Sequence, residues 1–430
     1  MQSRRHRLSR LVVLVATLLV CSLSAGFAYN LPYVQDRVGW RVAELRARIK
    51  YALFPPEEAV FTPDPTVAAM VQATFAALTP SPTASATPGP SATPAPSATP
   101  TLAPTPLPES VQLSGTRHEY QRWNNCGPAN LSMALSFWSW QGDQDDTAAI
   151  LKPNPRDKNV MPYEMANFVE EHTGLHVVVR VGGDLDTLRR FLAAGFSVLI
   201  EKGFEGPGFN GWMGHYELLT GYDDGTRQFT AQDSYIRPDL PVPYDQVESY
   251  WRHFNDTYLV VYPPERESEV MALLGPAADA TWASEHAAQR ASDEIYALTG
   301  RDVFFAWYNR GTNLVALRDY MGAAGAYDMA FQLYAELDPA TRPWRMLWYQ
   351  TGPYFAYFYS GRYYDVINLA TTTLEAMEEP VLEESYYWRA LAREALGDIP
   401  GAIEDLRTSL VYHTGFAPSL DALDRLGATP

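Results

Sequence analysis

The sequence predicts an α+β domain followed by an all-α helical region, and two patterns lead to this fold class. In residues 110–264 helical patterns come first and β-rich runs follow, which is typical of helices packed on an antiparallel sheet. In residues 276–427 apolar residues recur at helical spacing. An apolar run and a proline-rich stretch precede both regions, and they predict a single transmembrane helix and a disordered linker.

The charge of the 430-residue chain is unevenly distributed. Its net charge is −17 at neutral pH, although residues 1–50 hold nine basic and only two acidic side chains. An acidic body argues against general nucleic-acid binding, which needs a basic surface. The basic head and the acidic body are expected to face different surroundings.

Residues 1–10 form a basic head with four arginines, and residues 11–28 carry no charge. Eighteen helical residues at about 1.5 Å each span roughly 27 Å, close to the thickness of a bilayer core. Arginines before the run place the head in the cytoplasm and the body outside the cell. We therefore expect an uncleaved signal-anchor; the alternative is a cleaved signal peptide, since small residues follow the apolar run.

Residues 29–78 are interpreted as a juxtamembrane segment and residues 79–108 as the linker. The linker contains ten Pro, eleven Ser or Thr, six Ala and no charge, so it favours extended polyproline geometry. At about 3.1 Å per residue it could hold the body up to roughly 90 Å from its anchor. Its composition is also typical of O-glycosylated stalks.

The elements expected in residues 110–264 follow from apolar spacing and turn residues. Helices are expected at Cys126–Trp140, Met161–His172 and Asp184–Ala194. Strands are expected at Leu175–Val181, Phe196–Glu201, His215–Gly221, Arg227–Asp233 and Thr257–Tyr262.

The stretch YQRWNNCGPANLSMA carries the pattern of a nucleophile at a helix start. Pro128 suits the first turn of a helix, so Cys126 lies at or just before the amino end. The helix dipole and the free N–H groups there favour an anion and lower a thiol pKa. Gln121 lies five residues earlier, where its amide could stabilise a developing oxyanion. Because the sequence has only one other cysteine, Cys21, we expect no disulfide framework, no thiolate metal site and no cofactor.

A thiolate nucleophile needs a base and a group that orients the base, and His215 and Asp233 are the candidates. His215 follows a glycine-rich loop and opens the strand HYELLTGY, at the expected edge of a cleft. Asp233 ends the next strand, where a hairpin partner could reach the imidazole. His118 is nearer in sequence, but a Gln-then-Cys segment usually receives its base from elsewhere. The alternative for Cys126 is a buried structural cysteine. The alternative for His215 is a histidine that only makes structural hydrogen bonds within its strand, and the alternative for Asp233 is an aspartate that caps a turn.

The strings QRWNNCGPANLSMA, GHYELLTGYDD and FTAQDSY together resemble the bacteriocin-processing, double-glycine-leader cysteine peptidases of family 39 and their wider relatives. The resemblance covers about 150 residues and implies a papain-like fold with a Cys–His–Asp triad. It implies the roles of nucleophile, base, orienting carboxylate and oxyanion donor for Cys126, His215, Asp233 and Gln121. The family's Gln is often six residues before its Cys, whereas here it is five. No ATPase motif such as GxxxxGK[ST] occurs, so the resemblance does not imply a leader-peptide substrate.

The helical region contains related segments. The first places small and aromatic residues at characteristic offsets: Trp307, Gly311, Tyr320, Ala323, Tyr327 and Ala330. Gly361 and Gly397 lie 36 residues apart, whereas Trp307 and Trp348 lie 41 apart, so an insertion is expected. With a period near 34 residues, residues 276–427 resemble a tetratricopeptide solenoid of about three units. Most aromatic residues are expected to pack between helices, and a minority to line a peptide-binding face.

Together these patterns predict a membrane-anchored extracytoplasmic cysteine peptidase, a thiol hydrolase of peptide or amide bonds. Its helical repeats would bind the substrate or a protein partner. We expect a peptide or protein substrate, membrane contact through the N-terminal helix, and no nucleic acid. The alternatives are a non-catalytic tethered peptide-binding scaffold and a thiol acyltransferase that uses the same triad; the complete Cys–His–Asp set favours the hydrolase.

Overall fold

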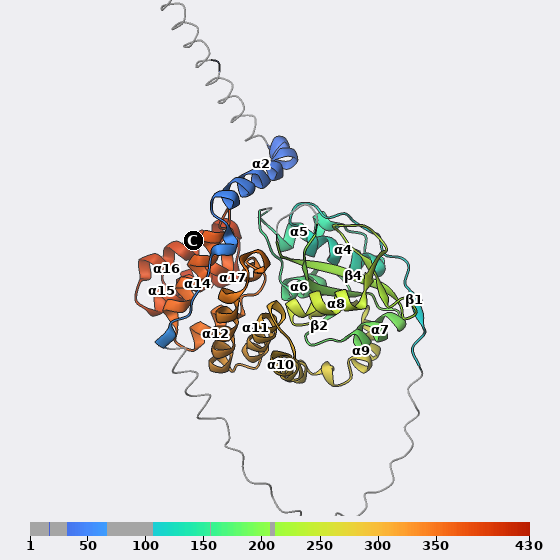
Figure 1. Ribbon diagram of the computed structural model, residues 1–430. Coiled ribbons are helices and arrows are strands. Elements are labelled where there is room, and N and C mark those ends of the chain that lie inside the picture. The colour runs from blue at the N-terminus through green and yellow to red at the C-terminus, as the bar shows by residue number, and fades with distance from the viewer. Residues whose placement is uncertain (1–16, 18–31, 67–105, 155, 207–210) are drawn as a thin grey trace, which may run out of the picture. The chain divides into compact units, whose positions relative to one another are not determined.

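The computed structural model describes residues 17, 32–66, 106–154, 156–206 and 211–430 (Figure 1). The chain divides into two compact units, residues 1–58 and residues 59–430. Apart from residue 17, the predicted transmembrane run lies outside the described residues, and so does most of the predicted linker. Within the described part of the chain, no helix combines the length and the apolar character that a bilayer span requires.

In the first unit the described residues form a helix, α2 (Pro32–Leu53), and a 3₁₀ turn, η1 (Pro56–Glu58). Leu45, Ile49 and Leu53 follow one another at four-residue spacing, and each side chain is more than half exposed. Residues at this spacing share one face of a helix, so α2 presents an apolar stripe.

The second unit begins its α+β part with a sheet whose described strands are all antiparallel to their neighbours. The strands are β1 (Ser110–Gln112), β2 (His176–Arg180), β3 (Val198–Phe204), β4 (Met213–Asp223), β5 (Gln228–Gln232), β6 (Leu240–Pro243) and β7 (Tyr258–Tyr262). Their spatial order is β2-β7-β3-β4-β5-β6, with β1 paired to β4. The predicted α+β class is therefore confirmed for this part.

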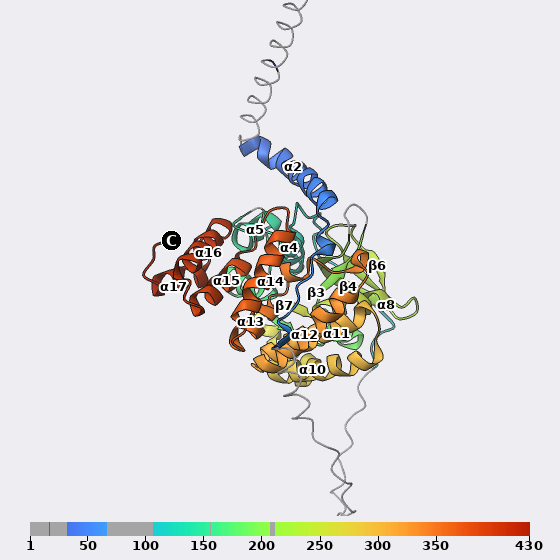
Figure 2. The same ribbon diagram turned by 60° about the vertical axis from the view of Figure 1, so that its left-hand side comes forward.

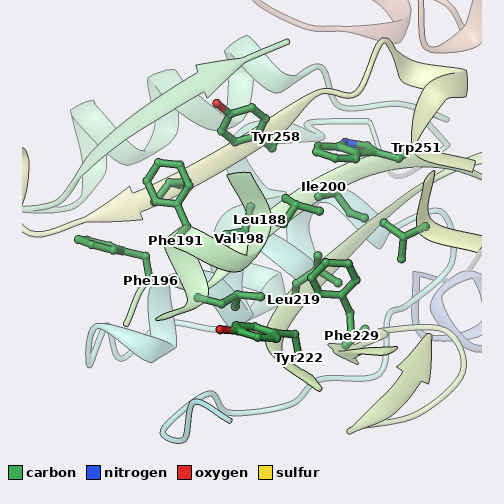
Figure 3. Packing of buried hydrophobic residues seen from close by; sticks show 14 of the residues in the cluster. Leu188, Phe191, Phe196, Val198, Ile200, Leu219, Tyr222, Phe229, Trp251 and Tyr258 are labelled. Atoms are coloured by element: carbon green, nitrogen blue, oxygen red, sulfur yellow. The ribbon is translucent and has the colours of Figure 1, made fainter. Parts of the chain in front are cut away.

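Two hydrophobic cores lie on opposite faces of this sheet. The first core draws on α4 (Cys126–Phe137), α5 (Gln144–Leu151) and α6 (Pro162–His172). The second, shown in Figure 3, draws on α7 (Leu185–Ala193), α8 (Tyr244–Trp251) and α9 (Glu267–Leu274). Side chains alternate between the faces along a strand, so Leu199 joins the first core and Val198 and Ile200 join the second. Because β3 is buried on both faces, the catalytic candidates beside it are held by a rigid scaffold.

Residues 280–425 are helical, as predicted. The helices are α10 (Ala280–Ala297), α11 (Arg301–Ala316), α12 (Tyr320–Glu336), α13 (Gly352–Tyr359), α14 (Tyr363–Ala376), α15 (Glu383–Ala395), α16 (Ile399–Tyr412) and α17 (Ala417–Arg425). Consecutive helices pack on one another. Gly361 and Gly397 come two residues after the ends of α13 and α15 and have φ of 77° and 86°. This left-handed conformation costs glycine little, which explains the two glycines noted in the sequence. The likeness to tetratricopeptide repeats stays a prediction.

Buried polar contacts join the helical region to the α+β part. The side chains of Asn255 and Asn313 exchange two hydrogen bonds of 2.8 and 2.9 Å. Arg345 Nη1 donates to the carbonyl of Trp212 at 2.7 Å. Unpaired polar groups would be costly in this interface, so these bonds favour one fixed arrangement of the two parts.

Residues 59–66, within the predicted juxtamembrane segment, belong to the second unit. Figure 2 shows residues 59–64 in blue as an extended trace along the helical region. The chain therefore contacts its own C-terminal helices before it enters the predicted linker.

Candidate active site

Cys126 is the first residue of α4, as the sequence predicted, and its side chain is half-buried. Asn124, two residues earlier, has a φ of 52°, a left-handed conformation that Asn adopts more readily than most residues. Lys152 Nζ donates to the carbonyl of Asn124 at 2.5 Å and holds this turn in place. The thiol therefore lies at the end of a helix whose first N–H groups have no partner within the helix, a position that favours an anion.

His215 on β4 and Asp233 directly after β5 are both buried, and they contact each other. Nε2 of His215 lies 3.2 Å from Oδ2 of Asp233. The other oxygen, Oδ1, accepts the backbone N–H groups of Tyr235 and Ile236, each at 2.7 Å. With one oxygen fixed by the backbone, Asp233 presents the other to the imidazole in a defined direction.

Cys126 and His215 line the same pocket, and the imidazole lies close enough to the thiol to change its pKa. Since Nε2 faces Asp233, Nδ1 is the ring nitrogen left for the thiol. The structure thus brings together three of the four predicted site residues, from a helix start, a strand and a strand end.

The charges at this site support one another. Burial alone would raise the pKa of Cys126, but the hydrogen bond and the positive charge of His215 hold it below the ordinary thiol value. Burial lowers the pKa of His215, whereas the charge of Asp233 and the bond to Cys126 outweigh it and raise the pKa to about 10. The arrangement therefore favours the thiolate–imidazolium pair over the neutral pair.

A buried ion pair lies beside the imidazole. Lys202 on β3 is in register with His215 on β4, and its Nζ lies 2.7 Å from Oε2 of Glu217. Against the effect of burial, Lys202 adds to His215 in holding the pKa of Asp233 below its usual range. Lys202 thus favours the negative charge of Asp233, whereas the carboxylates of Glu217 and Asp233 repel each other.

Gln121, the fourth predicted residue, is fixed to the residue after Asp233. Its backbone N–H donates to the carbonyl of Ser234 at 2.8 Å, and its Oε1 accepts the Ser234 hydroxyl at 2.9 Å. Asn130 on α4 in turn donates to the same hydroxyl at 2.9 Å. Oε1 of Gln121 is already engaged, so the hydrogens on Nε2 are left to donate hydrogen bonds. An oxyanion donor needs such N–H groups.

Cys126 and His215 line a small pocket with one wall from the helical region. The other lining residues are Asn124, Gly127, Lys158, Asn159, Val160, Glu201, Gly214, Tyr216 and Tyr349. Tyr349 directly follows the 3₁₀ turn η6 (Met346–Trp348). A Cβ built on Gly214 would lie 3.0 Å from its ring, so the tyrosine covers the backbone next to His215.

The sequence patterns did not identify Tyr349, Glu201 or Lys152 as residues of this site. Glu201 lies opposite Tyr216 in the sheet, and burial raises its pKa well above the ordinary value, which favours an uncharged carboxyl in the pocket wall. The one sequence signal for Tyr349 was the spacing of 41 residues between Trp307 and Trp348, which exceeds the repeat period near 34 residues. No group of His, Cys, Asp and Glu among the described residues is arranged to hold a metal ion.

The comparison with protein families assigns part of the chain. Residues 108–259 match the sequence model of the Peptidase_C39 like family. No curated protein matches the chain in sequence. The match ends before the helical region, which contributes Tyr349.

Three solved structures are similar to 36–37% of the chain. A protein described as a C39-like peptidase, from Bacillus anthracis, is 17% identical, with a TM-score of 0.30, and the match covers 36% of this chain and 98% of that one. A double glycine motif protease from an AMS/PCAT transporter, solved with the leader peptide, is 14% identical, with a TM-score of 0.28 and coverages of 36% and 94%. Xylellain, a cysteine protease from Xylella fastidiosa, is 16% identical, with a TM-score of 0.25 and coverages of 37% and 87%. The assignment rests on the family match: residues 108–259 form a Peptidase_C39-like domain.

Proposed function

We propose that the chain is a cysteine peptidase in which Cys126 is the nucleophile, His215 the base and Asp233 the orienting carboxylate. The observation that carries the proposal is that Cys126 lies beside His215 in one pocket and His215 contacts Asp233, within a domain that matches a peptidase family. A structural cysteine needs neither a buried histidine nor a carboxylate behind it.

The proposed reaction follows from these positions. The Cys126 thiolate attacks the carbonyl carbon of a peptide bond, and the Nε2 amide hydrogens of Gln121 stabilise the oxyanion that forms. The His215 imidazolium gives its proton to the leaving amine, which departs and leaves a thioester. His215, now neutral, accepts a proton from water, whose oxygen attacks the thioester and releases the acid and the thiolate.

We also propose that the helical region shapes the substrate pocket. Tyr349 lies over Gly214, and Gly127, also in the pocket wall, contributes no side chain. A Cβ on Gly127 would lie 3.1 Å from Val160, which shows how closely this wall is packed. The pocket therefore favours a small side chain next to the scissile bond, and the specificity would depend on both parts of the second unit.

Labelling by a thiol-directed activity probe tests the enzymatic proposal without a known substrate. The wild-type chain should be labelled at Cys126, and at pH 6.5 the His215→Ala chain should be labelled more slowly. A peptide library should then be cleaved by the wild-type chain and not by Cys126→Ala. Equal labelling of both chains, with no cleavage of the library, would favour the non-catalytic scaffold. Product analysis with added amines separates hydrolysis from acyl transfer.

The location of the protein is a further part of the proposal. The arginine-rich head before an uncharged run at residues 11–28 supports an anchored chain with residues 110–430 outside the cytoplasm. Protease treatment of intact cells should digest the body if this is correct. Protection of the body would reverse the proposed topology, and a soluble form that starts near residue 29 would show cleavage.

A further inference from the structure

A short segment before the predicted linker lies against the helical region in an extended conformation. Residues 59–64 form neither helix nor strand, and burial alternates along residues 61–64. Phe61 and Pro63 are buried, whereas Thr62 and Asp64 are exposed. Alternate burial is how an extended peptide presents one side to the surface that binds it.

Phe61 is the principal apolar contact of this segment. Only 6% of its surface is exposed, although it lies in a segment without regular structure. Its ring meets Phe331 of α12 edge to face at 5.0 Å, and it lies 5.9 Å from Tyr357 of α13. Such edge-to-face pairs add to the gain from burial and fix the direction of the ring.

A polar contact fixes the position of the segment along the helices. The backbone N–H of Asp64 donates to Oδ1 of Asp365 on α14 at 3.0 Å. The other oxygen of Asp365 accepts Nε of Arg362 at 2.7 Å, and Arg362 is also bound to Asp328 of α12 at 2.7 Å. A buried ionic network that joins α12 and α14 thus presents an acceptor to the peptide backbone.

We propose that the surface formed by Phe331, Tyr357 and Asp365 is a binding site for extended peptides of the pattern Phe-x-Pro-Asp. In this chain residues 61–64, Phe-Thr-Pro-Asp, occupy the site in cis. The site is separate from the Cys126 pocket, and it does not depend on the proposed peptidase activity. A separate peptide with the same pattern competes with the chain's own segment.

Occupation in cis changes the role of the predicted linker. Residues 59–66 and residues 106–430 belong to the same compact unit, so the stretch between them begins and ends on that unit. In this proposal it is a connection within the unit rather than a spacer between the anchor and the body.

Binding of a labelled peptide that spans residues 59–66 tests the proposal on the full chain. The Phe61→Ala chain has lost its own anchor side chain, so its site should be open and bind the peptide. The wild-type chain should bind at least tenfold more weakly, because the tethered segment competes at a high effective concentration. Thr62→Ala is the matched control: its side chain is exposed, and this chain should behave like the wild type. A peptide with Ala in place of Phe should bind to none of the three chains.

Two results would overturn the proposal. One is that the peptide does not bind to a Phe61→Ala chain that melts like the wild type. The other is that the peptide binds equally well to the wild-type chain and to the Phe61→Ala chain. Should Phe61→Ala fail to fold, hydrogen exchange in the wild-type chain decides the question. The Asp64 amide should exchange slowly because it donates to Asp365, and exchange at the rate of an unstructured peptide would refute cis binding.

Discussion

Replacement of His215 by Ala should change the reactivity of Cys126 in opposite directions at low and high pH. In the wild-type chain His215 is the main group that lowers the thiol pKa against the effect of burial. Without the imidazole, burial dominates, so the thiol pKa should return to the ordinary value of about 8.5 or rise above it. The sign of the change in reactivity then depends on which form of the thiol is present.

Two effects set the magnitude. At pH 6.5 a thiol of pKa about 8.5 is only about 1% ionised, so the variant has few thiolates available. Each unit of higher pKa makes the thiolate itself about threefold more nucleophilic, since the Brønsted coefficient is about 0.4–0.5. At a pH below the thiol pKa of both chains, Cys126 of the variant should therefore react about threefold more slowly per unit of pKa difference. At a pH above both pKa values it should react about threefold faster per unit. The rate-against-pH profiles of the two chains should therefore cross.

The assay is the rate of iodoacetamide alkylation between pH 5 and pH 10. A Cys21→Ser background leaves Cys126 as the sole thiol of the chain. His118→Ala is the matched control, because Nε2 of His118 contacts the carbonyl of Asp233 at 3.0 Å and is close to the site. This control should keep the wild-type midpoint. Coincident profiles for the wild-type and His215→Ala chains would refute the proposed role of the histidine.

Three further predictions concern the oxyanion, the pocket and Glu164, a carboxyl on α6. Gln121→Ala should lower kcat for peptide cleavage about 10²–10³-fold and leave alkylation of Cys126 unchanged, whereas an equal loss of both would contradict an oxyanion role. In a peptide library, Tyr349→Ala should accept larger side chains next to the scissile bond. Tyr349→Phe is the control, because it keeps the ring over Gly214 and should keep the wild-type preference. Identical preferences of the wild-type chain and both variants would show that the ring does not shape the pocket. Burial raises the pKa of Glu164 to about 7, so its protonated form stabilises the fold at low pH, and this contribution is lost as the pH rises through about 7. Urea unfolding at pH 5 and pH 8 should show a smaller loss of stability for Glu164→Gln than for the wild type, and an equal loss in both would count against this reasoning.

The regular elements of the α+β part were predictable where a single pattern dominated. The predicted helix at Asp184–Ala194 corresponds to α7, because Asp184 caps it and buried residues recur at helical spacing. The strand β6 was missed because it is a four-residue edge strand with prolines at positions 241 and 243, and proline usually argues against a strand. The missed helix α5 does carry a signal, since Asp143 and Asp146 form a capping box.

The candidate site was predictable only in part. Cys126, His215 and Asp233 could be found because each lies at or near the end of an element, where chemistry-bearing residues tend to be exposed to a cleft. Lys202 could not be assigned, because its relation to His215 depends on the register of β3 and β4. Tyr349 comes from a different part of the chain altogether, and only packing of the helical region brings it to the pocket.

The binding of residues 59–66 to the helical region also sets the order in which parts of the chain can reach their folded contacts. Asp64 and its partner Asp365 are 301 residues apart in sequence. At roughly 5–20 residues per second, a ribosome makes the partner roughly 15–60 s after the segment itself. During that interval Phe61 has no native surface to contact and is available to chaperones. The part of the second unit that is synthesised first is therefore among the last to reach its final contacts.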